Sequence, residues 1–167
     1  MSRGRRISRV KLIPPSEETA DRYLLECDHK RLYQSPESFP KLTAKEIFNA
    51  GGPISLDIGC GTGEFLLATA ETHPEEFFLG IEISRRAIYH AVHLAEKRKL
   101  ANLKFLKADF ALLYPLIPEK SLNRVYLNFP DPNYGGAKKR KQRIFSPRFL
   151  DLMAAALNKD GRIQVVT

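Results

Sequence analysis

Acidic residues and glycines gather in a short stretch whose chemistry suits a cationic ligand. Asp57 directly precedes a turn with three alternating glycines, which are Gly59, Gly61 and Gly63. Glycines let a chain turn sharply and approach a ligand closely. A dinucleotide site needs a third glycine where this chain has Glu64. A carboxylate beside the turn repels a pyrophosphate and attracts a positively charged or amino group.

Further polar residues follow at intervals that suit the rest of such a ligand. Glu82, nineteen residues past Gly63, can accept hydrogen bonds from two ribose hydroxyls. Asp109 can accept a hydrogen bond from an adenine amino group, and we expect Asn128 to contact the same ligand. S-adenosylmethionine combines an ammonium, a sulfonium, a ribose and an adenine. The spacing therefore predicts S-adenosylmethionine as the cofactor.

The elements that must position these residues alternate between strand and helix. Short segments that are rich in apolar residues or alternate between apolar and polar residues predict strands over residues 54–58, 77–83, 103–107, 122–129 and 161–167. Helical spacing and capping residues predict helices over residues 43–49, 64–72, 84–99 and 147–157. This alternation predicts an α/β, Rossmann-like, doubly wound and mostly parallel sheet, which binds ligands at the carboxyl ends of its strands.

The first part of the chain differs from the rest. Prolines punctuate residues 1–40, which we expect to be irregular. In the helix expected after them, Thr43 would be the N-cap and Glu46 would complete a capping box. We therefore expect a basic, partly irregular extension over residues 1–50 and a single domain over residues 51–167.

Positive charge is concentrated in two tracts of a chain whose net charge is +8. Residues 1–13 hold five basic residues and residues 138–148 hold six, with no acid in either tract, so the remainder has a net charge of −3. Basic tracts on a near-neutral body favour a polyanionic partner such as nucleic acid.

Several classes of protein are disfavoured by composition. No apolar run reaches the roughly 18 residues that span a bilayer, and no secretion signal is evident at the N-terminus, so we expect a cytoplasmic protein with no membrane partner. Cys27 and Cys60 are expected to be free thiols. Scattered histidines, including His90 and His93 on one helix, lack the spacing of a metal site, so no metal is expected.

Residues 54–167 resemble class I S-adenosylmethionine-dependent methyltransferases. Asp57, the three glycines, Glu82 and Asp109 carry this resemblance. It becomes narrower at Phe129-Pro130-Asp131-Pro132, which is followed by a basic run and Arg143-Ile144. This arrangement resembles the tRNA (guanine-N7)-methyltransferase family, so the implied activity is methyl transfer to guanine N7 in tRNA.

The resemblance implies roles for individual residues. Asp131 matches the catalytic aspartate of that family and can accept hydrogen bonds from the N1–H and N2–H donors of guanine. Guanine N7 already has a free lone pair, so the reaction needs orientation rather than a strong base. The residues expected to bind tRNA are Lys138, Lys139, Arg140, Lys141, Arg143 and Thr167.

The sequence also departs from the family. Asn133 stands where the family has Trp, and the sequence given ends at Thr167, where the family continues with Asp and further elements. The last C-terminal strands of the sheet are therefore expected to be missing. A homodimer, a partner chain or the chain's own residues 1–40 would then cover the edge of the last strand.

Two alternatives remain open. Asn128-Phe129-Pro130-Asp131 is reminiscent of the Asn-Pro-Pro-aromatic turn of amino-methylating enzymes, which act on other nucleic-acid positions. That turn needs a proline at Phe129 and an aromatic ring at Asp131. The second alternative is a tRNA-binding protein that has the fold but is non-catalytic or depends on a partner, which the Trp-to-Asn difference and the end at Thr167 favour.

Overall fold

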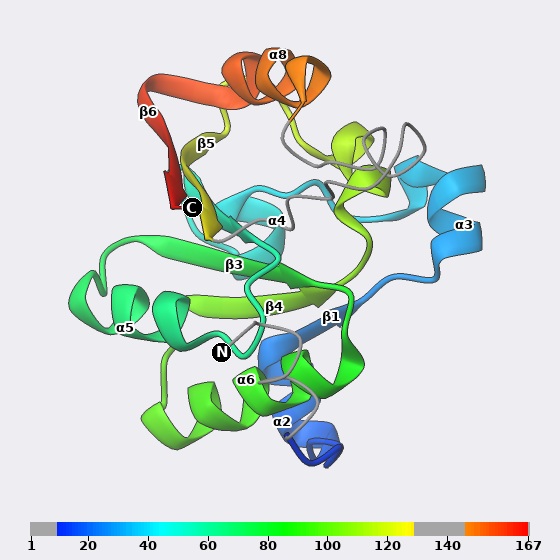
Figure 1. Cartoon of the computed structure of the whole chain (residues 1–167), viewed down its shortest axis with the longest axis vertical. Coiled ribbons are helices and arrows are strands. Elements are labelled where there is room, and N and C mark those ends of the chain that lie inside the picture. Colours follow the sequence, from blue (N-terminus) through cyan, green and yellow to red (C-terminus); the bar gives the residue numbers. More distant parts are fainter. Residues whose placement is uncertain (1–9, 129–145, 167) are drawn as a thin grey trace.

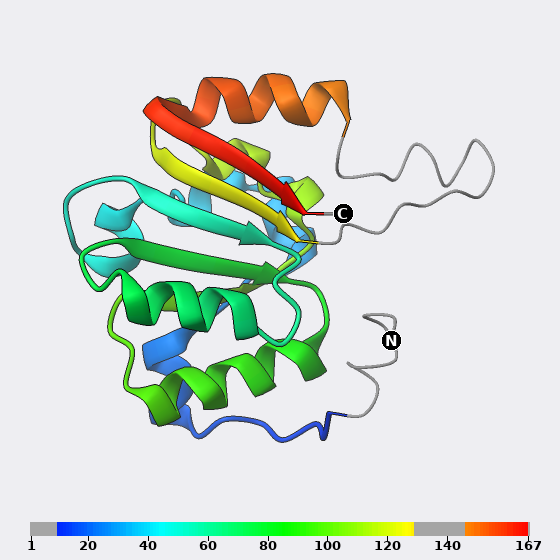
Figure 2. The same cartoon turned by 60° about the vertical axis from the view of Figure 1, so that its left-hand side comes forward.

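The computed structural model describes residues 10–128 and 146–166. Six strands form one sheet in the order β1-β4-β3-β2-β5-β6, and every pair is parallel. The strands are β1 (Leu24–Glu26), β2 (Ile54–Ile58), β3 (Phe77–Glu82), β4 (Leu103–Lys107), β5 (Leu122–Asn128) and β6 (Leu157–Val166). Because all run the same way, their carboxyl ends meet at one edge of the sheet (Figures 1 and 2). The expected α/β parallel sheet is confirmed.

Helices cover both faces of this sheet (Figure 2). One face packs against α2 (Glu17–Tyr23), α5 (Glu64–Thr72) and α6 (Arg85–Arg98). The other packs against α3 (His29–Gln34), α4 (Ala44–Phe48) and α8 (Pro147–Ala156), with short 3-10 turns η1 (Pro36–Ser38), η2 (Phe110–Leu112) and η3 (Tyr114–Leu116). The apolar side chains of each face form a separate buried cluster. The chain is therefore a three-layer, doubly wound domain.

Local sequence signals account for most element boundaries. The strands at residues 54–58 and 103–107 and the helix at residues 64–72 have the predicted bounds. Ser84 and Ser146 accept hydrogen bonds from main-chain N–H groups in the first turns of α6 and α8, as N-caps do. Thr43 likewise caps α4. The expected capping box is incomplete, however, because the Glu46 carboxylate accepts from the Lys41 N–H at 2.6 Å instead of from the N–H of Thr43.

The irregular structure expected for residues 1–40 is wrong for residues 17–38, which form α2, β1, α3 and η1. Strand β1 adds to the sheet beside β4, at the opposite edge from β6, so the described part of this segment does not cover the edge of β6, as it was expected to do as one alternative. Tyr23 and Leu32 are 2% and 1% exposed and belong to the two buried clusters. The segment is therefore packed on both faces of the sheet. The domain boundary expected at residue 51 stays a prediction.

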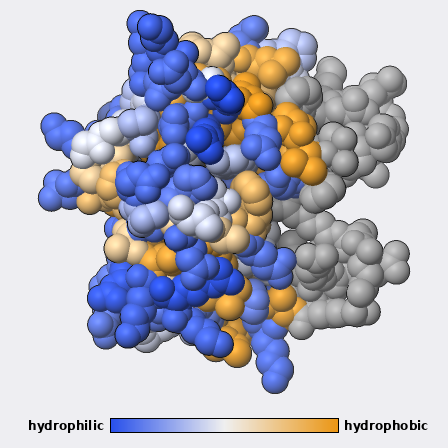
Figure 3. All heavy atoms as spheres, turned by 90° about the vertical axis from the view of Figure 1, so that its left-hand side faces the viewer, coloured by the Kyte–Doolittle hydropathy of each residue, from blue (hydrophilic) through white to orange (hydrophobic). Residues whose placement is uncertain are grey.

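Strand β6 is longer than predicted and lies at one edge of the sheet. It begins at Leu157 rather than at residue 161, because its first residue already pairs with Leu122 of β5. In the described part of the chain, no strand pairs with the other side of β6. Val165 is 37% exposed, and Figure 3 shows apolar surface among hydrophilic side chains on this side of the molecule. A second chain along this edge stays a prediction.

Truncation of Leu32 tests whether the N-terminal segment is part of the core. Because its side chain is 1% exposed, Leu32→Ala should lower the free energy of unfolding by about 2–4 kcal/mol. Leu12→Ala is the matched control, since Leu12 is 51% exposed and should lose less than about 0.5 kcal/mol. Denaturant unfolding measures both. Equal, small losses would show that α3 does not pack on the sheet.

Candidate functional site

The turn after β2 has a backbone that glycine alone adopts easily. Gly59, Gly61 and Gly63 all have positive φ, at 72°, 60° and 76°. Gly63 also starts α5, and a Cβ atom there would lie 2.9 Å from the Ala91 Cβ and 3.2 Å from the Phe105 ring. The glycines therefore bring the turn and the first helix close against α6 and β4.

The Glu82 carboxylate connects this turn to the next helix. Its Oε2 atom accepts from the Gly61 N–H at 2.9 Å, and its Oε1 atom accepts from the Ser84 N–H at 2.8 Å. Glu82 is the last residue of β3 and only 8% exposed, while Ser84 is the N-cap of α6. Hydrogen bonds of this kind to a charged group contribute about 1.5–3 kcal/mol each. The carboxylate thus fixes the turn beside the positive end of the α6 dipole.

Asp57 lies on the same face of the sheet as Glu82. Side chains alternate along β2, so Leu56 and Ile58 enter the cluster beneath α4 and α8, while Asp57 points to the face covered by α5 and α6. Asp57 is 1% exposed and is in register with Gly80 of β3. Two buried acids, Asp57 and Glu82, therefore lie on neighbouring strands and on the same face of the sheet, near the glycine turn.

Gly80 is a site residue that the sequence analysis missed. A Cβ atom there would lie 2.9 Å from the Cys60 Sγ and 2.7 Å from the Phe105 ring. The turn after β2 can approach β3 only because this position has no side chain. A glycine inside an apolar strand is a known signal of close backbone approach, so the sequence carried the information.

Asp109 and Asn128 occupy the ends of the next two strands. Asp109 is exposed, follows β4 by two residues, and accepts from the Ala111 N–H through Oδ1 at 3.0 Å. Asn128 is the last residue of β5, is half-buried, and is in register with Val166 of β6. The structure thus places Asp57, Glu82, Asp109 and Asn128 on four different strands or strand ends at one edge. Their roles toward a ligand stay predictions.

Two side chains beside these acids were not singled out from the sequence. Ile83, directly after Glu82, is 61% exposed, so a large apolar side chain lies open at this edge. His29 comes from the N-terminal segment, and its Nε2 atom accepts from the Asp109 N–H at 3.4 Å. No sequence pattern could identify this contact, because it joins residues eighty positions apart.

Tyr114 and Arg148 extend the edge on the α8 side. The Arg148 guanidinium carbon lies 5.8 Å from the centre of the Tyr114 ring. Burial raises the pKa of the Tyr114 phenol, the charge of Arg148 opposes the shift, and the charge of Asp109 adds to it. Tyr114 is therefore a neutral hydroxyl at neutral pH. Arg148, at the end of the basic tract 138–148, lies within electrostatic reach of the same ring as Asp109.

Metal and thiol chemistry find no support among the described residues. Residues 10–128 and 146–166 contain no group of three or more His, Cys, Asp or Glu side chains that could hold a metal ion. Both cysteines are free thiols, as expected. Burial raises the pKa of the Cys27 thiol, and Lys107 opposes that shift, so Cys27 is not an activated nucleophile. In the part of the chain that is described, no helix is both long and apolar enough to cross a membrane.

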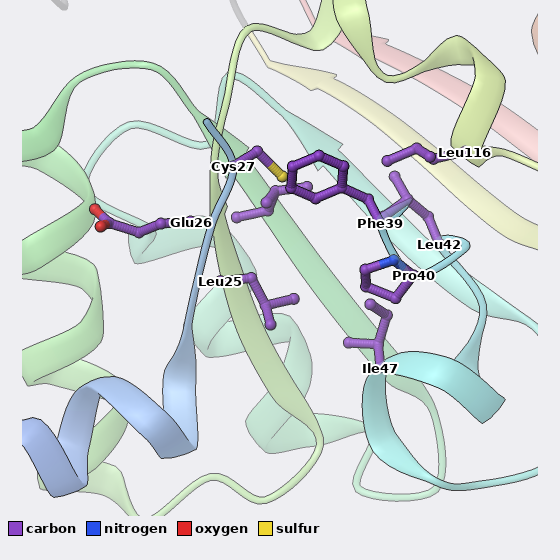
Figure 4. Close-up of a pocket in the computed structure, with 9 residues that line it drawn as sticks. Leu25, Glu26, Cys27, Phe39, Pro40, Leu42, Ile47 and Leu116 are labelled. Atoms are coloured by element: carbon purple, nitrogen blue, oxygen red, sulfur yellow. The ribbon is translucent and has the colours of Figure 1, made fainter. Parts of the chain in front are cut away.

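A small cavity lies between β1 and the segment that carries Phe39, Pro40 and Leu42 (Figure 4). Its volume is about 80 Å³, which is too small for a nucleoside. Apolar side chains and Glu26 line it, and the lining residues are Leu25, Glu26, Cys27, Phe39, Pro40, Leu42, Ile47, Leu106 and Leu116. We assign it to imperfect packing between the N-terminal segment and the sheet.

The remaining expected site residues lie outside the described part of the chain. They are Asp131, Lys138, Lys139, Arg140, Lys141, Arg143 and Thr167. The described residues on either side, Asn128 and Ser146, show that this stretch joins the carboxyl end of β5 to the start of α8. It therefore starts from the same edge as the acids.

Comparison with known proteins agrees with this arrangement. Residues 51–167 match the family described as "Putative methyltransferase". Among solved structures, a 30S ribosomal A1408 methyltransferase from an uncultured bacterium superposes with a TM-score of 0.53 at 18% identity, covering 86% of this chain and 62% of that one. At this identity the likeness shows the fold, which is that of class I methyltransferases.

Curated relatives are more similar in sequence. The tRNA (guanine-N(7)-)-methyltransferase of Rubrobacter xylanophilus is 41% identical over 98% of this chain and 73% of its own length. The protein of the same name from Chloroherpeton thalassium is 37% identical over 99% of this chain and 73% of its own length. Similarity of this extent, together with the match to a methyltransferase family, shows that the chain belongs to the tRNA (guanine-N(7)-)-methyltransferase family.

Proposed function

We propose that this protein transfers a methyl group from S-adenosylmethionine to N7 of a guanine in tRNA. The observation that carries the proposal is the Glu82 carboxylate, which joins the glycine turn to the start of α6 at the carboxyl edge of a parallel sheet. That edge is where such sheets bind nucleotides. The relatives named for this activity support the choice of substrate.

The residues at the edge fit the parts of S-adenosylmethionine. Glu82 uses one lone pair of each oxygen for a main-chain N–H, so each oxygen can still accept a bond from a ribose hydroxyl. Ile83 offers an exposed apolar side chain next to it for the flat adenine base. Asp109 is exposed and can accept from the adenine amino group. The buried charge of Asp57 favours the cationic end of the cofactor.

The reaction asks the protein mainly for orientation. When bound, S-adenosylmethionine supplies an activated methyl group, which the lone pair of guanine N7 attacks as the carbon–sulfur bond breaks. We assign Asp131 to hold the guanine through its N1–H and N2–H donors, which adenine lacks. The side chains at residues 138–143, with Arg148, would hold tRNA phosphates beside the edge. We place Thr167, which follows β6, at the same substrate side.

Removal of the Glu82 carboxylate should weaken cofactor binding. Glu82→Ala should reduce the affinity for S-adenosylhomocysteine by about 1–3 kcal/mol, because ribose bonds and the hold on the turn are both lost. Isothermal calorimetry with a chelator present measures this. Glu119→Ala is the control, since Glu119 is an exposed acid before β5, at the opposite edge, and should change nothing. Undiminished binding by Glu82→Ala would exclude Glu82 from the site.

Loss of Asp131 should stop catalysis while leaving cofactor binding nearly intact. Asp131→Ala should slow methyl transfer to tRNA by about a hundredfold or more, because guanine is no longer oriented. Mass spectrometry of nucleosides from incubated tRNA measures 7-methylguanosine. Asp151→Ala, an exposed acid on α8, should keep the wild-type rate. A near wild-type rate for Asp131→Ala would contradict the assignment and favour a different methyl acceptor.

The basic tract should give tRNA binding a steep salt dependence. Each phosphate contact contributes about −0.7 to −0.9 to the slope of log affinity against log salt. Replacing Lys138, Lys139 and Arg140 by Ala should therefore make the slope less steep by about 2–3 and leave S-adenosylhomocysteine binding unchanged. Fluorescence titrations at several salt concentrations measure it. The same triple change at exposed residues elsewhere, Lys97, Lys120 and Lys159, is the control. Equal slopes for both triple variants would make the tract ordinary solvated surface.

A further inference from the structure

The N-terminal segment adds one more strand end to the candidate cofactor edge. Strand β1 is parallel to β4, with Glu26 in register with Lys107. The Lys107 Nζ atom lies 4.0 Å from the Glu26 Oε1 atom, so the two strand ends are also joined by an ion pair. The chain that leaves β1 therefore runs beside the chain that leaves β4. These are residues 27–29 and residues 108–109, and the second stretch ends in the acid assigned to the adenine.

His29 contacts that acid directly. It is the first residue of α3, whose N-cap is Asp28 through a 2.8 Å bond from the Arg31 N–H. The His29 Nε2 atom accepts from the Asp109 N–H at 3.4 Å. Asp109 in turn accepts from the Ala111 N–H through Oδ1. Asp109 is thus held at its main chain by His29 and at its side chain by η2.

Packing beneath the contact makes it more than a chance meeting of exposed groups. Leu32, one turn after His29 in α3, is 1% exposed, and Phe110, directly after Asp109, is 4% exposed. Both side chains enter the same buried cluster. The helix that carries His29 and the turn that carries Asp109 are therefore fixed in the core on either side of the hydrogen bond. The His29 imidazole therefore contacts the Asp109 main chain from a helix that is held in place by the core.

We propose that His29 is a positioning residue for the adenine base of the cofactor. By accepting from the Asp109 N–H, it fixes the turn in which the free oxygen of the Asp109 carboxylate can accept from the adenine 6-amino group. Without this bond, the Asp109 N–H would lose its acceptor, and the turn that orients the carboxylate would be held less firmly. This inference rests on the proposed function, because it assumes that Asp109 binds adenine.

His29 should affect which base the site prefers as well as the affinity for the cofactor. Hypoxanthine carries an oxygen where adenine carries the 6-amino group, so it offers Asp109 an acceptor in place of a donor. A well-oriented carboxylate should reject it by about tenfold or more, since hydrogen bonds to charged groups are among the stronger ones. A poorly oriented carboxylate should discriminate less. Loss of a residue that only stabilised the fold would lower the affinity for both ligands equally.

The test compares S-adenosylhomocysteine with S-inosylhomocysteine by calorimetry on the full chain. His29→Leu removes the acceptor and should lower the affinity for S-adenosylhomocysteine about threefold to tenfold. It should also reduce the preference for this ligand over S-inosylhomocysteine. His29→Gln places an amide oxygen near the Nε2 position and should keep both values within about twofold of wild type. His93→Leu is the matched control, because His93 also bonds a main-chain atom, the Ile13 oxygen at 3.0 Å, and should change neither value.

Three results would overturn the proposal. The first is a wild-type affinity of His29→Leu for both ligands. The second is an equal loss of affinity for both ligands in His29→Leu. The third is a loss of affinity in His29→Gln as large as in His29→Leu. Asp109→Ala separates this failure from failure of the proposed function. If Asp109→Ala loses the preference for adenine and His29→Leu keeps it, only the role of His29 is wrong. If the wild-type chain binds neither ligand, the proposed cofactor site is wrong as well.

Discussion

The two hydrogen bonds accepted by Glu82 are the interaction on which the candidate site depends. They connect the end of β3 to the turn after β2 through Gly61 and to the start of α6 through Ser84. Gly61 lies in a turn and Ser84 is an N-cap, so the main-chain N–H of each has no acceptor within a helix or strand and needs one from elsewhere. A carboxylate that is 8% exposed supplies that acceptor and keeps its remaining lone pairs at the edge. Fold and candidate chemistry therefore share one side chain.

The candidate site also requires glycine at two positions where a side chain would not fit. Gly63 lets α5 start beside Ala91 and Phe105, and Gly80 leaves room for Cys60 in the turn. In both places a Cβ atom would be closer than 3 Å to a neighbour. Close packing of this kind allows little adjustment, because protein interiors are nearly as dense as crystals. The position of the turn relative to Glu82 therefore depends on the absence of side chains at Gly63 and Gly80 as well as on the hydrogen bonds of Glu82.

The sequence predicted those parts of the fold that are determined locally. Residues 54–58 and 103–107 are short segments rich in apolar residues, so both strands could be predicted with their bounds. Strand β1 has only three residues, Leu24–Glu26, and no alternation to detect, because its identity comes from pairing with β4. For the same reason the contact of His29 could not be predicted, while the positions of Glu82 and Asp109 could, since Glu82 ends its own strand and Asp109 follows its own. Glu46 shows the opposite case, in which a correct local motif was satisfied by a different partner, Lys41.

The proposed cationic cofactor and polyanionic substrate would make opposite electrical demands on one edge of the sheet, and burial would separate them. Asp57 and Glu82 are 1% and 8% exposed, so solvent and salt screen their charges weakly and only over the space next to them. Arg148 is exposed and held over the Tyr114 ring, where its charge is screened within about 8 Å at physiological salt. The buried acids would interact with the cofactor at short range, and the exposed Arg148 would interact with the tRNA phosphates. One edge of the sheet could therefore bind both ligands. The exposed Asp109 is the exception among the acids, and it is the one whose main chain has a second support, from His29.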